Sequence, residues 1–502
     1  MNLPNTMSPV LAGLADTVLQ PGFRGTTLPD WVRRRLAAGL GGITLYSRNI
    51  GPDGRTSELT AAIRAENPHV LIALDEEGGD VTRLEAFTGS SRPGNLALGA
   101  ADDTTLTRTV AQGIGRDLAA AGVRLNYAPV VDLHSDLDNP VIGTRAFGSD
   151  PRLVARHTAA WVTGLQSAGV AACAKHFPGH GATAVDSHDA LPTITCSAAE
   201  LAATALIPYR AAIAAGVRAI MTGHLLVPAF DAESPATMSR RLMVNLLRHD
   251  LGFDGLIVTD GIEMPAVSAT YGLGGAAVRA LAAGADAICV GGENATPGVV
   301  GLLRNSIVAA VTDGTLPEER LAEAAARVRT LAEWTATPLG DSPSALQTIA
   351  GGAAERAAAE RALRVTVNRR PGPSGPPHVI ELDAPTNLAV DPNTPWGLAT
   401  PLSELLPGTT SVRLAEPSTA ELATAADAGT GRALVVVART AFRHAWLPTA
   451  LRLLLDRRPD SIVVELGVPG GDRPGAVHVA TFGSTALCAR VAAAAIAALI
   501  SS

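Results

Sequence analysis

Short apolar runs alternate with longer Ala-, Leu- and Arg-rich segments along the first two thirds of the chain. Such runs suit buried parallel strands, and the segments between them have the composition of helices. This alternation predicts βα units, in which consecutive strands are parallel and helices cover the sheet. The strand candidates lie at residues 42–46, 70–74, 125–131, 170–174, 219–222, 256–259 and 287–290, with an eighth near Val18.

Ionisable side chains stand at the ends of several of these runs. Asp75 follows the second run, Lys175 and His176 the fourth, His224 the fifth and Asp260 the sixth. Ordinary polar loops account for one or two such residues but not readily for five. Ionisable groups at the carboxyl ends of many parallel strands are typical of the active-site face of a (β/α)8 barrel. The sequence therefore predicts a TIM-type barrel with a site at that face.

The barrel pattern fades near residue 340, in a segment rich in Pro, Gly and Ser. Beyond it, strand candidates recur on a smaller scale at 378–382, 410–414, 433–437, 461–465 and 477–482. The 502 residues suffice for a barrel of roughly 250 residues or more and a second, smaller domain. We therefore expect an α/β protein with a TIM-type (β/α)8 barrel over residues 1–340 and an α/β sandwich domain over 341–502.

The net charge of −7 gives the chain no global electrostatic reason to bind nucleic acid or an anionic membrane. The four cysteines form no CxxC pair and have no zinc-like spacing, which favours isolated buried thiols. The first twenty residues lack the basic segment of a signal peptide. We expect a soluble, cytoplasmic protein without a nucleic-acid or membrane partner, and its oligomeric state stays open.

The densest polar segment is Lys175-His-Phe-Pro-Gly-His-Gly181, followed closely by Asp186-Ser-His188. Four interpretations compete: a metal site, a phosphate-binding loop, a solvated surface loop, and a sugar-hydrolysis site with a His–Asp pair. The histidines lack the usual metal-ligand spacing, and no helix-forming residues follow at once as in a phosphate loop. In an extended segment, Asp186 and His188 project to the same side, so the carboxylate can orient the imidazole for proton transfer.

A proton-transfer pair of this kind needs a nucleophile for covalent sugar hydrolysis. Asp260 directly follows the apolar run Leu256-Ile-Val-Thr259. A carboxylate in that place rarely serves the core, and one with access to an anomeric carbon can form a glycosyl-enzyme intermediate.

The sequence resembles glycoside hydrolase family 3, and within it the two-domain bacterial β-N-acetylglucosaminidases. The resemblance covers about residues 10–335. Its motifs are Asp75-Glu-Glu-Gly-Gly-Asp-Val-Thr-Arg83, Asn139-Pro-Val-Ile-Gly-Thr-Arg-Ala-Phe147, Lys175-His-Phe-Pro-Gly-His-Gly181, Asp186-Ser-His188, Met221-Thr-Gly-His224 and Val258-Thr-Asp260. The long element from Lys175 to His188 is the most specific of these motifs.

The resemblance implies a role for each matching residue. Asp260 would be the catalytic nucleophile, and His188 the general acid/base with Asp186 as its partner. Asp75, Arg83, Arg145, Lys175, His176 and His224 would bind the sugar and its N-acetyl group. No metal and no cofactor is expected.

Two departures from the family pattern lie beside these residues. Many members have Gln where this chain has Glu76, and many have Asp-Leu or Ala-Leu where it has Gly261-Ile262. A glycine at 261 should leave more space or backbone freedom beside Asp260. Glu263, two residues further, is interpreted as a structural residue.

Asp186-Ser-His188 favours the N-acetylglucosaminidase branch over the β-glucosidase branch, whose acid/base is usually a Glu on a later domain. We expect a retaining exo-β-N-acetylglucosaminidase that releases terminal GlcNAc from muropeptides or short chito-oligosaccharides during cell-wall recycling. The alternatives are a β-N-acetylglucosaminide phosphorylase, a β-glucosidase, a catalytically silent sugar-binding protein and a metal-dependent hydrolase.

Overall fold

The computed structural model describes residues 8–51, 55–183, 185–187, 190–291, 294–336, 352–440 and 443–501. The chain forms two compact units. The first comprises Met1–Glu76, Arg108–Ile142 and Ser149–Gln347, and the second comprises Glu77–Thr107, Gly143–Gly148 and Thr348–Ser502. Two short segments of the second unit therefore come from the part of the chain that the sequence assigns to the barrel. The predicted boundary near residue 340 lies outside the described residues.

The described residues of the first unit contain eight parallel strands in chain order. They are β1 (Leu19–Pro21), β2 (Gly42–Leu45), β3 (Leu71–Leu74), β4 (Leu125–Asn126), β5 (Ala171–Phe177), β6 (Ala219–Thr222), β7 (Leu256–Thr259) and β8 (Ile288–Val290). Strands β2 to β7 form one sheet in that order, and β1 pairs with β8. A bridge between Val258 and Ala287 joins β7 to β8, and Thr44 Oγ1 donates to the Gln20 carbonyl between β2 and β1. The sheet thus closes, and the predicted TIM-type (β/α)8 barrel is confirmed.

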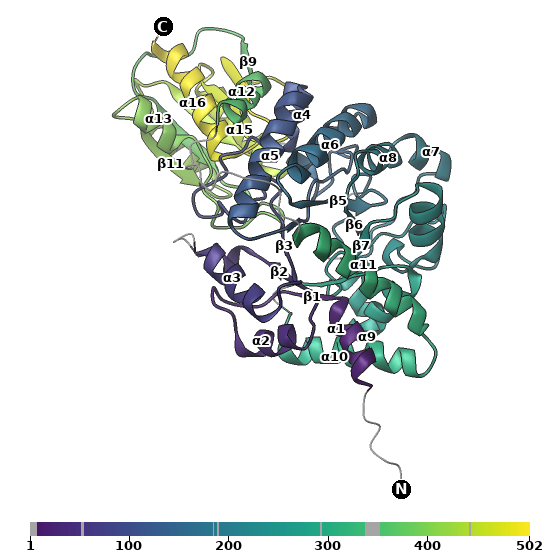
Figure 1. Ribbon diagram of the computed structural model, residues 1–502. Coiled ribbons are helices and arrows are strands. Elements are labelled where there is room, and N and C mark those ends of the chain that lie inside the picture. Colours follow the sequence, from purple (N-terminus) through teal and green to yellow (C-terminus); the bar gives the residue numbers. More distant parts are fainter. Residues whose placement is uncertain are drawn as a thin grey trace. The chain divides into compact units, whose positions relative to one another are not determined.

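Helices surround these strands, as Figure 1 shows for the purple-to-green part of the chain. They are α1 (Pro9–Thr17), α2 (Asp30–Ala37), α3 (Thr56–Glu66), α5 (Thr104–Ala120), α6 (Pro151–Gln166), α7 (Ala198–Ala203), α8 (Leu206–Ala214), the π-helix η4 (Arg241–Asp250), α9 (Pro265–Ala283), α10 (Pro297–Thr312) and α11 (Glu318–Ala336). Short 3₁₀ turns occupy η1 (Ser47–Asn49) and η3 (Ala236–Met238). The sequence sets helix starts locally: Asp150 accepts hydrogen bonds from the Arg152 and Leu153 amides, and Pro151 is the first residue of α6.

Helix α11 covers the amino-terminal end of the barrel. Its residues Val328, Leu331 and Ala332 pack into one cluster with the first residues of several strands, including Leu125 and Leu256. The opposite end of the barrel, where the strands finish, is left for the polar side chains that follow them. Strand β5 is buried along its whole length, as expected for a parallel strand covered on both faces.

The second unit contains a six-stranded sheet in the order β11-β10-β12-β13-β14-β9. Its strands are β9 (Arg364–Val367), β10 (His378–Leu382), β11 (Thr410–Leu414), β12 (Leu434–Ala438), β13 (Ile462–Glu465) and β14 (Val477–Ala480). Five of them are parallel, and β9 pairs antiparallel with β14 at one edge. The sequence did not predict β9, a four-residue strand with mostly exposed residues.

Helices cover both faces of this sheet, which confirms the predicted α/β sandwich. Leu402 of α13 and Ile496 of α16 pack on one face, and Leu422 of α14 and Leu451 of α15 pack on the other. The helices of the unit are α4 (Asn95–Ala101), α12 (Ala353–Ala362), α13 (Ala399–Leu405), α14 (Thr419–Ala428), α15 (Trp446–Arg457) and α16 (Ala486–Ser501), with a 3₁₀ turn η2 (Gly143–Arg145).

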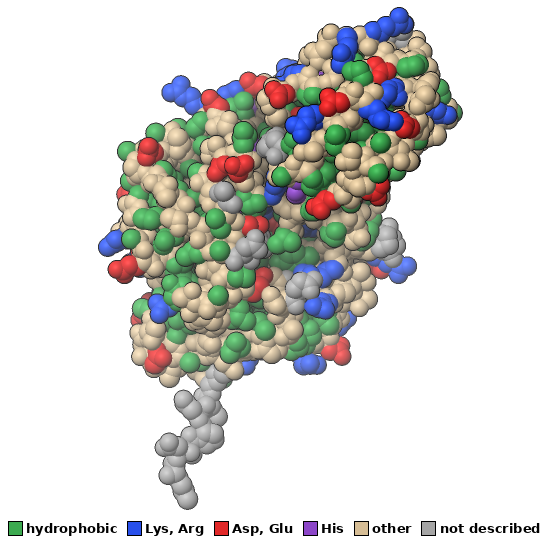
Figure 2. All heavy atoms as spheres, turned by 180° about the vertical axis from the view of Figure 1, so that it is seen from behind, with side chains coloured by type: hydrophobic (Ala, Val, Ile, Leu, Met, Phe, Trp, Pro, Cys, Tyr) green, Lys and Arg blue, Asp and Glu red, His purple; other side chains and the backbone are tan. Residues whose placement is uncertain are grey.

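Charged side chains of both signs are interspersed on the face of the molecule drawn in Figure 2. That distribution agrees with the near balance of 40 basic and 47 acidic residues in the chain. Within the described part of the chain, no helix has both the length and the apolar character needed to cross a membrane.

Candidate active site

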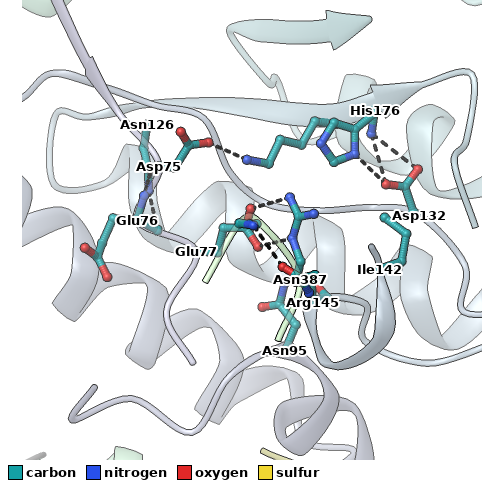
Figure 3. A network of polar contacts seen from close by, with 12 residues as sticks. Asp75, Glu76, Glu77, Asn95, Asn126, Asp132, Ile142, Arg145, His176 and Asn387 are labelled. Atoms are coloured by element: carbon teal, nitrogen blue, oxygen red, sulfur yellow. Dashed lines mark hydrogen bonds and ion pairs between the residues drawn. The ribbon is translucent and has the colours of Figure 1, made fainter. Parts of the chain in front are cut away.

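Asp75 and Lys175 form an ion pair at the carboxyl-terminal end of the barrel. Asp75 follows the last residue of β3, and Lys175 lies in β5 with only 2% of its side chain exposed. The Lys175 Nζ donates to Asp75 Oδ1 over 2.6 Å, a contact that Figure 3 marks with a dashed line at the labelled Asp75. A reciprocal pair of backbone–side-chain hydrogen bonds between Glu76 and Asn126 fixes the segment after β3 to β4. A carboxylate and an ammonium group are thus paired at this end of the barrel.

Asp132 holds the segment at the end of β5. One carboxylate oxygen lies 2.7 Å from Nδ1 of His176, and the carboxylate also accepts the backbone N–H groups of His176 and His180. Asp132 is buried, so its charge is compensated by these donors. The Asp132 carboxylate at Nδ1 orients the His176 ring, so that Nε2 points away from Asp132. Asp132 directly follows the third predicted strand run but was not among the predicted site residues.

We expect Asp132→Asn to destabilise the barrel and to weaken substrate capture. The amide has one acceptor oxygen in place of two, so buried donors lose partners at about 1–3 kcal/mol each. The expected result is a melting temperature lower by several degrees and about a tenfold loss in kcat/KM, measured by calorimetry and initial rates. The exposed Asp138→Asn is the control and should behave as wild type. Equal melting temperatures for the two variants would contradict this role of Asp132.

The loop after β5 is anchored by His180. Its Nε2 lies 3.2 Å from Ser187 Oγ, and Asn139 Nδ2 donates to the carbonyls of His180 and Thr183. Burial, reinforced by the neighbouring His176, lowers the pKa of His180, so this ring is a neutral anchor near neutral pH. Asp186 is partly buried on the same loop, and the predicted acid/base His188 lies outside the described residues.

Asp260 follows the last residue of β7 and is partly exposed. Its backbone N–H donates to the Thr222 carbonyl of β6, and its Oδ1 accepts the Gly261 N–H over 2.8 Å. His224 supports this loop from β6: its Nε2 lies 2.9 Å from the Gly261 carbonyl, and its Nδ1 lies 2.9 Å from Thr237 Oγ1. His224 is fully buried, and these two bonds occupy both ring nitrogens. Its predicted contact with sugar stays a prediction.

The pKa shifts of two buried thiols indicate that Asp75, Lys175 and Asp260 lie in one region. Burial raises the pKa of Cys289 well above its ordinary value, and the carboxylates of Glu263, Asp260 and Asp75 raise it further. Burial likewise raises the pKa of Cys173, where Lys175 opposes the effect and Asp75 and Asp260 add to it. Both thiols therefore stay neutral and unreactive, while the carboxylates and the lysine act on common neighbours at the strand ends.

Arg83 and Arg145 belong to the second unit. Arg145 is buried and forms a two-pronged ion pair with Glu77, with its Nε and Nη2 2.9 and 2.8 Å from the two carboxylate oxygens. Its carbonyl accepts a hydrogen bond from Asn95. Arg83 donates from Nη1 to the carbonyl of Ala389. In the structure, Glu77 fixes the Arg145 guanidinium.

The described residues contain no group of three or more His, Cys, Asp or Glu side chains arranged to hold a metal ion. Of the four cysteines, three are buried as predicted and Cys196 is partly exposed.

The model of the family "Glycosyl hydrolase family 3 N terminal domain" matches residues 28–331. A beta-hexosaminidase of Xanthomonas oryzae pv. oryzae is 38% identical over 287 residues, which are 56% of this chain and 83% of that protein. Beta-hexosaminidase A of Pseudoalteromonas piscicida is 35% identical over 284 residues, 52% of this chain, and the chain spans about half (47%) of its length.

A solved structure extends the similarity to nearly the whole chain. A glycoside hydrolase family 3 beta-N-acetylglucosaminidase from Paenibacillus sp. str. FPU-7 superposes with a TM-score of 0.86 at 31% identity, covering 97% of both chains. A beta-glucoside phosphorylase shares the fold, with a TM-score of 0.78 at 20% identity over 97% of this chain and 92% of that one. With the barrel, its charged strand ends and a family model that spans more than half of its residues, the chain belongs to glycosyl hydrolase family 3 and is a glycoside hydrolase.

Proposed function

We propose that the chain is a retaining exo-β-N-acetylglucosaminidase. It would release terminal GlcNAc from muropeptides or short chito-oligosaccharides, in the cytoplasm and as part of cell-wall recycling. The observation that carries the proposal is the group of Asp75, Lys175 and Asp260 at the carboxyl-terminal end of one barrel. Relatives named beta-hexosaminidase and beta-N-acetylglucosaminidase support the choice of sugar.

In the first step, an Asp260 carboxylate oxygen forms a bond to the anomeric carbon while the bond from that carbon to the departing oxygen breaks. The departing oxygen takes a proton from His188, the acid that the family resemblance assigns. Asp260 is partly exposed at a strand end, so its oxygens have access to a substrate. Its Gly261 hydrogen bond fixes the carboxylate before the reaction.

In the second step, water attacks the anomeric carbon and gives a proton to His188, and the bond to Asp260 breaks. Two displacements restore the original β configuration. The paired Asp75 and Lys175 offer an acceptor and a donor to sugar hydroxyls. On the barrel unit, the carboxylates of Asp75, Asp260 and Glu263 outnumber the ammonium group of Lys175 at this end. That balance suits a neutral terminal sugar better than a negatively charged one.

The proposal is tested by initial rates with 4-nitrophenyl β-GlcNAc and 4-nitrophenyl β-glucoside. We expect kcat/KM to favour the GlcNAc substrate by at least about tenfold, because a site that binds the N-acetyl group leaves polar groups unpaired with glucose. The first sugar released should be the β-anomer, observed by NMR before mutarotation. A clear preference for the glucoside, or release of the α-anomer, would contradict the proposal.

Phosphorolysis is separated from hydrolysis in the same assay. With added inorganic phosphate, a hydrolase gives free GlcNAc as the dominant product. GlcNAc-1-phosphate as the dominant product would replace hydrolysis with phosphorolysis, the reaction named for a structural neighbour of this fold.

A further inference from the structure

The Glu263 carboxylate sits between two glycines. Its Oε2 accepts the backbone N–H of Gly291 over 2.8 Å. A Cβ atom at Gly291 would lie 1.7 Å from Oε1, and one at Gly261 would lie 2.8 Å from the same oxygen. A side chain at Gly291 would collide with the carboxylate, and one at Gly261 would press on it. The chain therefore leaves room for this acid on both sides, at the two loops that end β7 and β8.

The backbone around Glu263 is also fixed. Ser268 Oγ donates to the Glu263 carbonyl over 2.7 Å, and the Ile262 N–H donates to the Cys289 carbonyl of β8. With the bond from Gly291, the loop that begins at Asp260 is tied to β8 by a backbone and a side-chain contact. A glutamate that only faced solvent would not accept the Gly291 N–H.

Several titratable groups face Asp260 and Glu263 from the surrounding strands. They are Tyr46 after β2, Asp75 after β3, Cys173 and Lys175 on β5, His180 on the loop after β5, His224 after β6 and Cys289 on β8. Burial keeps the pKa of the tyrosine and of both thiols high, so these groups are neutral near pH 7. The Lys175 charge is compensated by its direct partner Asp75. The carboxylates of Glu263 and Asp260 both raise the pKa of Cys289, so both place negative charge near the same thiol.

We propose that Glu263 is a positioning residue for Asp260, which ties the nucleophile loop to β8 and holds a second negative charge beside it. This proposal rests on the proposed function, in which Asp260 attacks the sugar. A like charge nearby disfavours ionisation of a carboxylate and makes the ionised form more basic. A more basic carboxylate is a stronger nucleophile, and it loses activity at a higher pH on acidification.

The test uses Glu263→Gln, whose amide oxygen still accepts the Gly291 N–H while the charge is removed. We expect kcat with aryl β-GlcNAc to fall about tenfold, with KM little changed. The acid limb of the kcat/KM profile should move to lower pH, so that activity at pH 4.5 relative to pH 7 rises about threefold. A purely structural role would leave the shape of the profile unchanged.

A glycine variant tests the space around the Glu263 carboxylate independently of its charge. Gly291→Ala should displace the carboxylate and lower kcat at least as much as Glu263→Gln. The matched control is Gly275→Ala in α9, where the new Cβ would meet only Tyr271 Cβ at 3.9 Å. This control should keep wild-type kcat and pH dependence.

The outcomes separate this proposal from the proposed function. If wild type cleaves aryl β-GlcNAc and Asp260→Asn does not, the proposed function stands. An unchanged kcat and pH profile in Glu263→Gln, or wild-type kcat in Gly291→Ala, then overturns the role of Glu263 alone. If Asp260→Asn keeps full turnover, Asp260 is not the nucleophile and the proposed function itself is contradicted.

Discussion

Replacement of Asp260 by asparagine should reduce kcat on aryl β-GlcNAc by about 10³-fold or more, without a change in melting temperature. The amide cannot form the glycosyl-enzyme bond, and the loss corresponds to about 4 kcal/mol of transition-state stabilisation. The fold should survive because the asparagine side-chain oxygen can still accept the Gly261 N–H. Steady-state rates and calorimetry on the same preparation measure both quantities.

A smaller side chain at the same position provides a positive control. In Asp260→Ala, added azide can enter from the face that the carboxylate occupied. We expect partial recovery of aryl-glycoside cleavage, with an α-glycosyl azide as the product. Turnover by Asp260→Asn within tenfold of wild type would contradict the assignment of the nucleophile.

Replacement of Asp286 by alanine should strongly lower the free energy of unfolding. Asp286 is fully buried and accepts hydrogen bonds from the Ile257 N–H, from Arg248 over 2.5 Å and from Arg320 over 2.6 Å. Arg327 lies 3.4 Å away. Burial lowers the pKa of Arg248, and Asp286 opposes that effect. Removing the carboxylate takes the counter-ion from the buried Arg248 guanidinium, at a cost of about 3–5 kcal/mol, whereas Arg320 and Arg327 keep their ion pairs with Glu323.

This loss should lower the calorimetric melting temperature of the barrel unit by about 10 °C. Because Asp286 precedes β8, at the opposite end of the strands from Asp260, kcat at 25 °C should stay near the wild-type value. The control Glu66→Gln removes the exposed ion pair to Arg33 and should change stability by less than about 1 kcal/mol. A melting temperature of Asp286→Ala equal to that of Glu66→Gln would contradict this prediction.

The strands of the barrel could be predicted because parallel strands buried on both faces leave continuous apolar runs in the sequence. The residues that end these runs, Asp75 and Asp260 among them, could be predicted for the same reason. Strand β9 could not, since it is a short, exposed edge strand next to a helix. The grouping of residues 77–107 and 143–148 with the second unit depends on tertiary contacts, for which no local pattern exists.

The roles of some residues of the candidate site also could not be predicted from any sequence pattern. Asp132 stands one residue past a predicted strand, and only its three buried donors identify its role. Glu77 is recognised by its two-pronged pair with Arg145, a contact between residues 68 positions apart. Glu263 was interpreted as structural because distance along a loop says nothing about reach. The space at Gly261 was predicted, whereas the carboxylate that occupies it was found in the structure.

The central claim is that Asp260 forms a covalent bond to a β-GlcNAc residue. A fluorinated β-GlcNAc donor with a good leaving group slows breakdown of the intermediate, so that it accumulates for mass spectrometry of proteolytic peptides. We predict one sugar adduct per chain, on the peptide that contains Asp260, and no adduct on Asp260→Asn. An adduct on another carboxylate, or inactivation of the enzyme without any adduct, would contradict the claim.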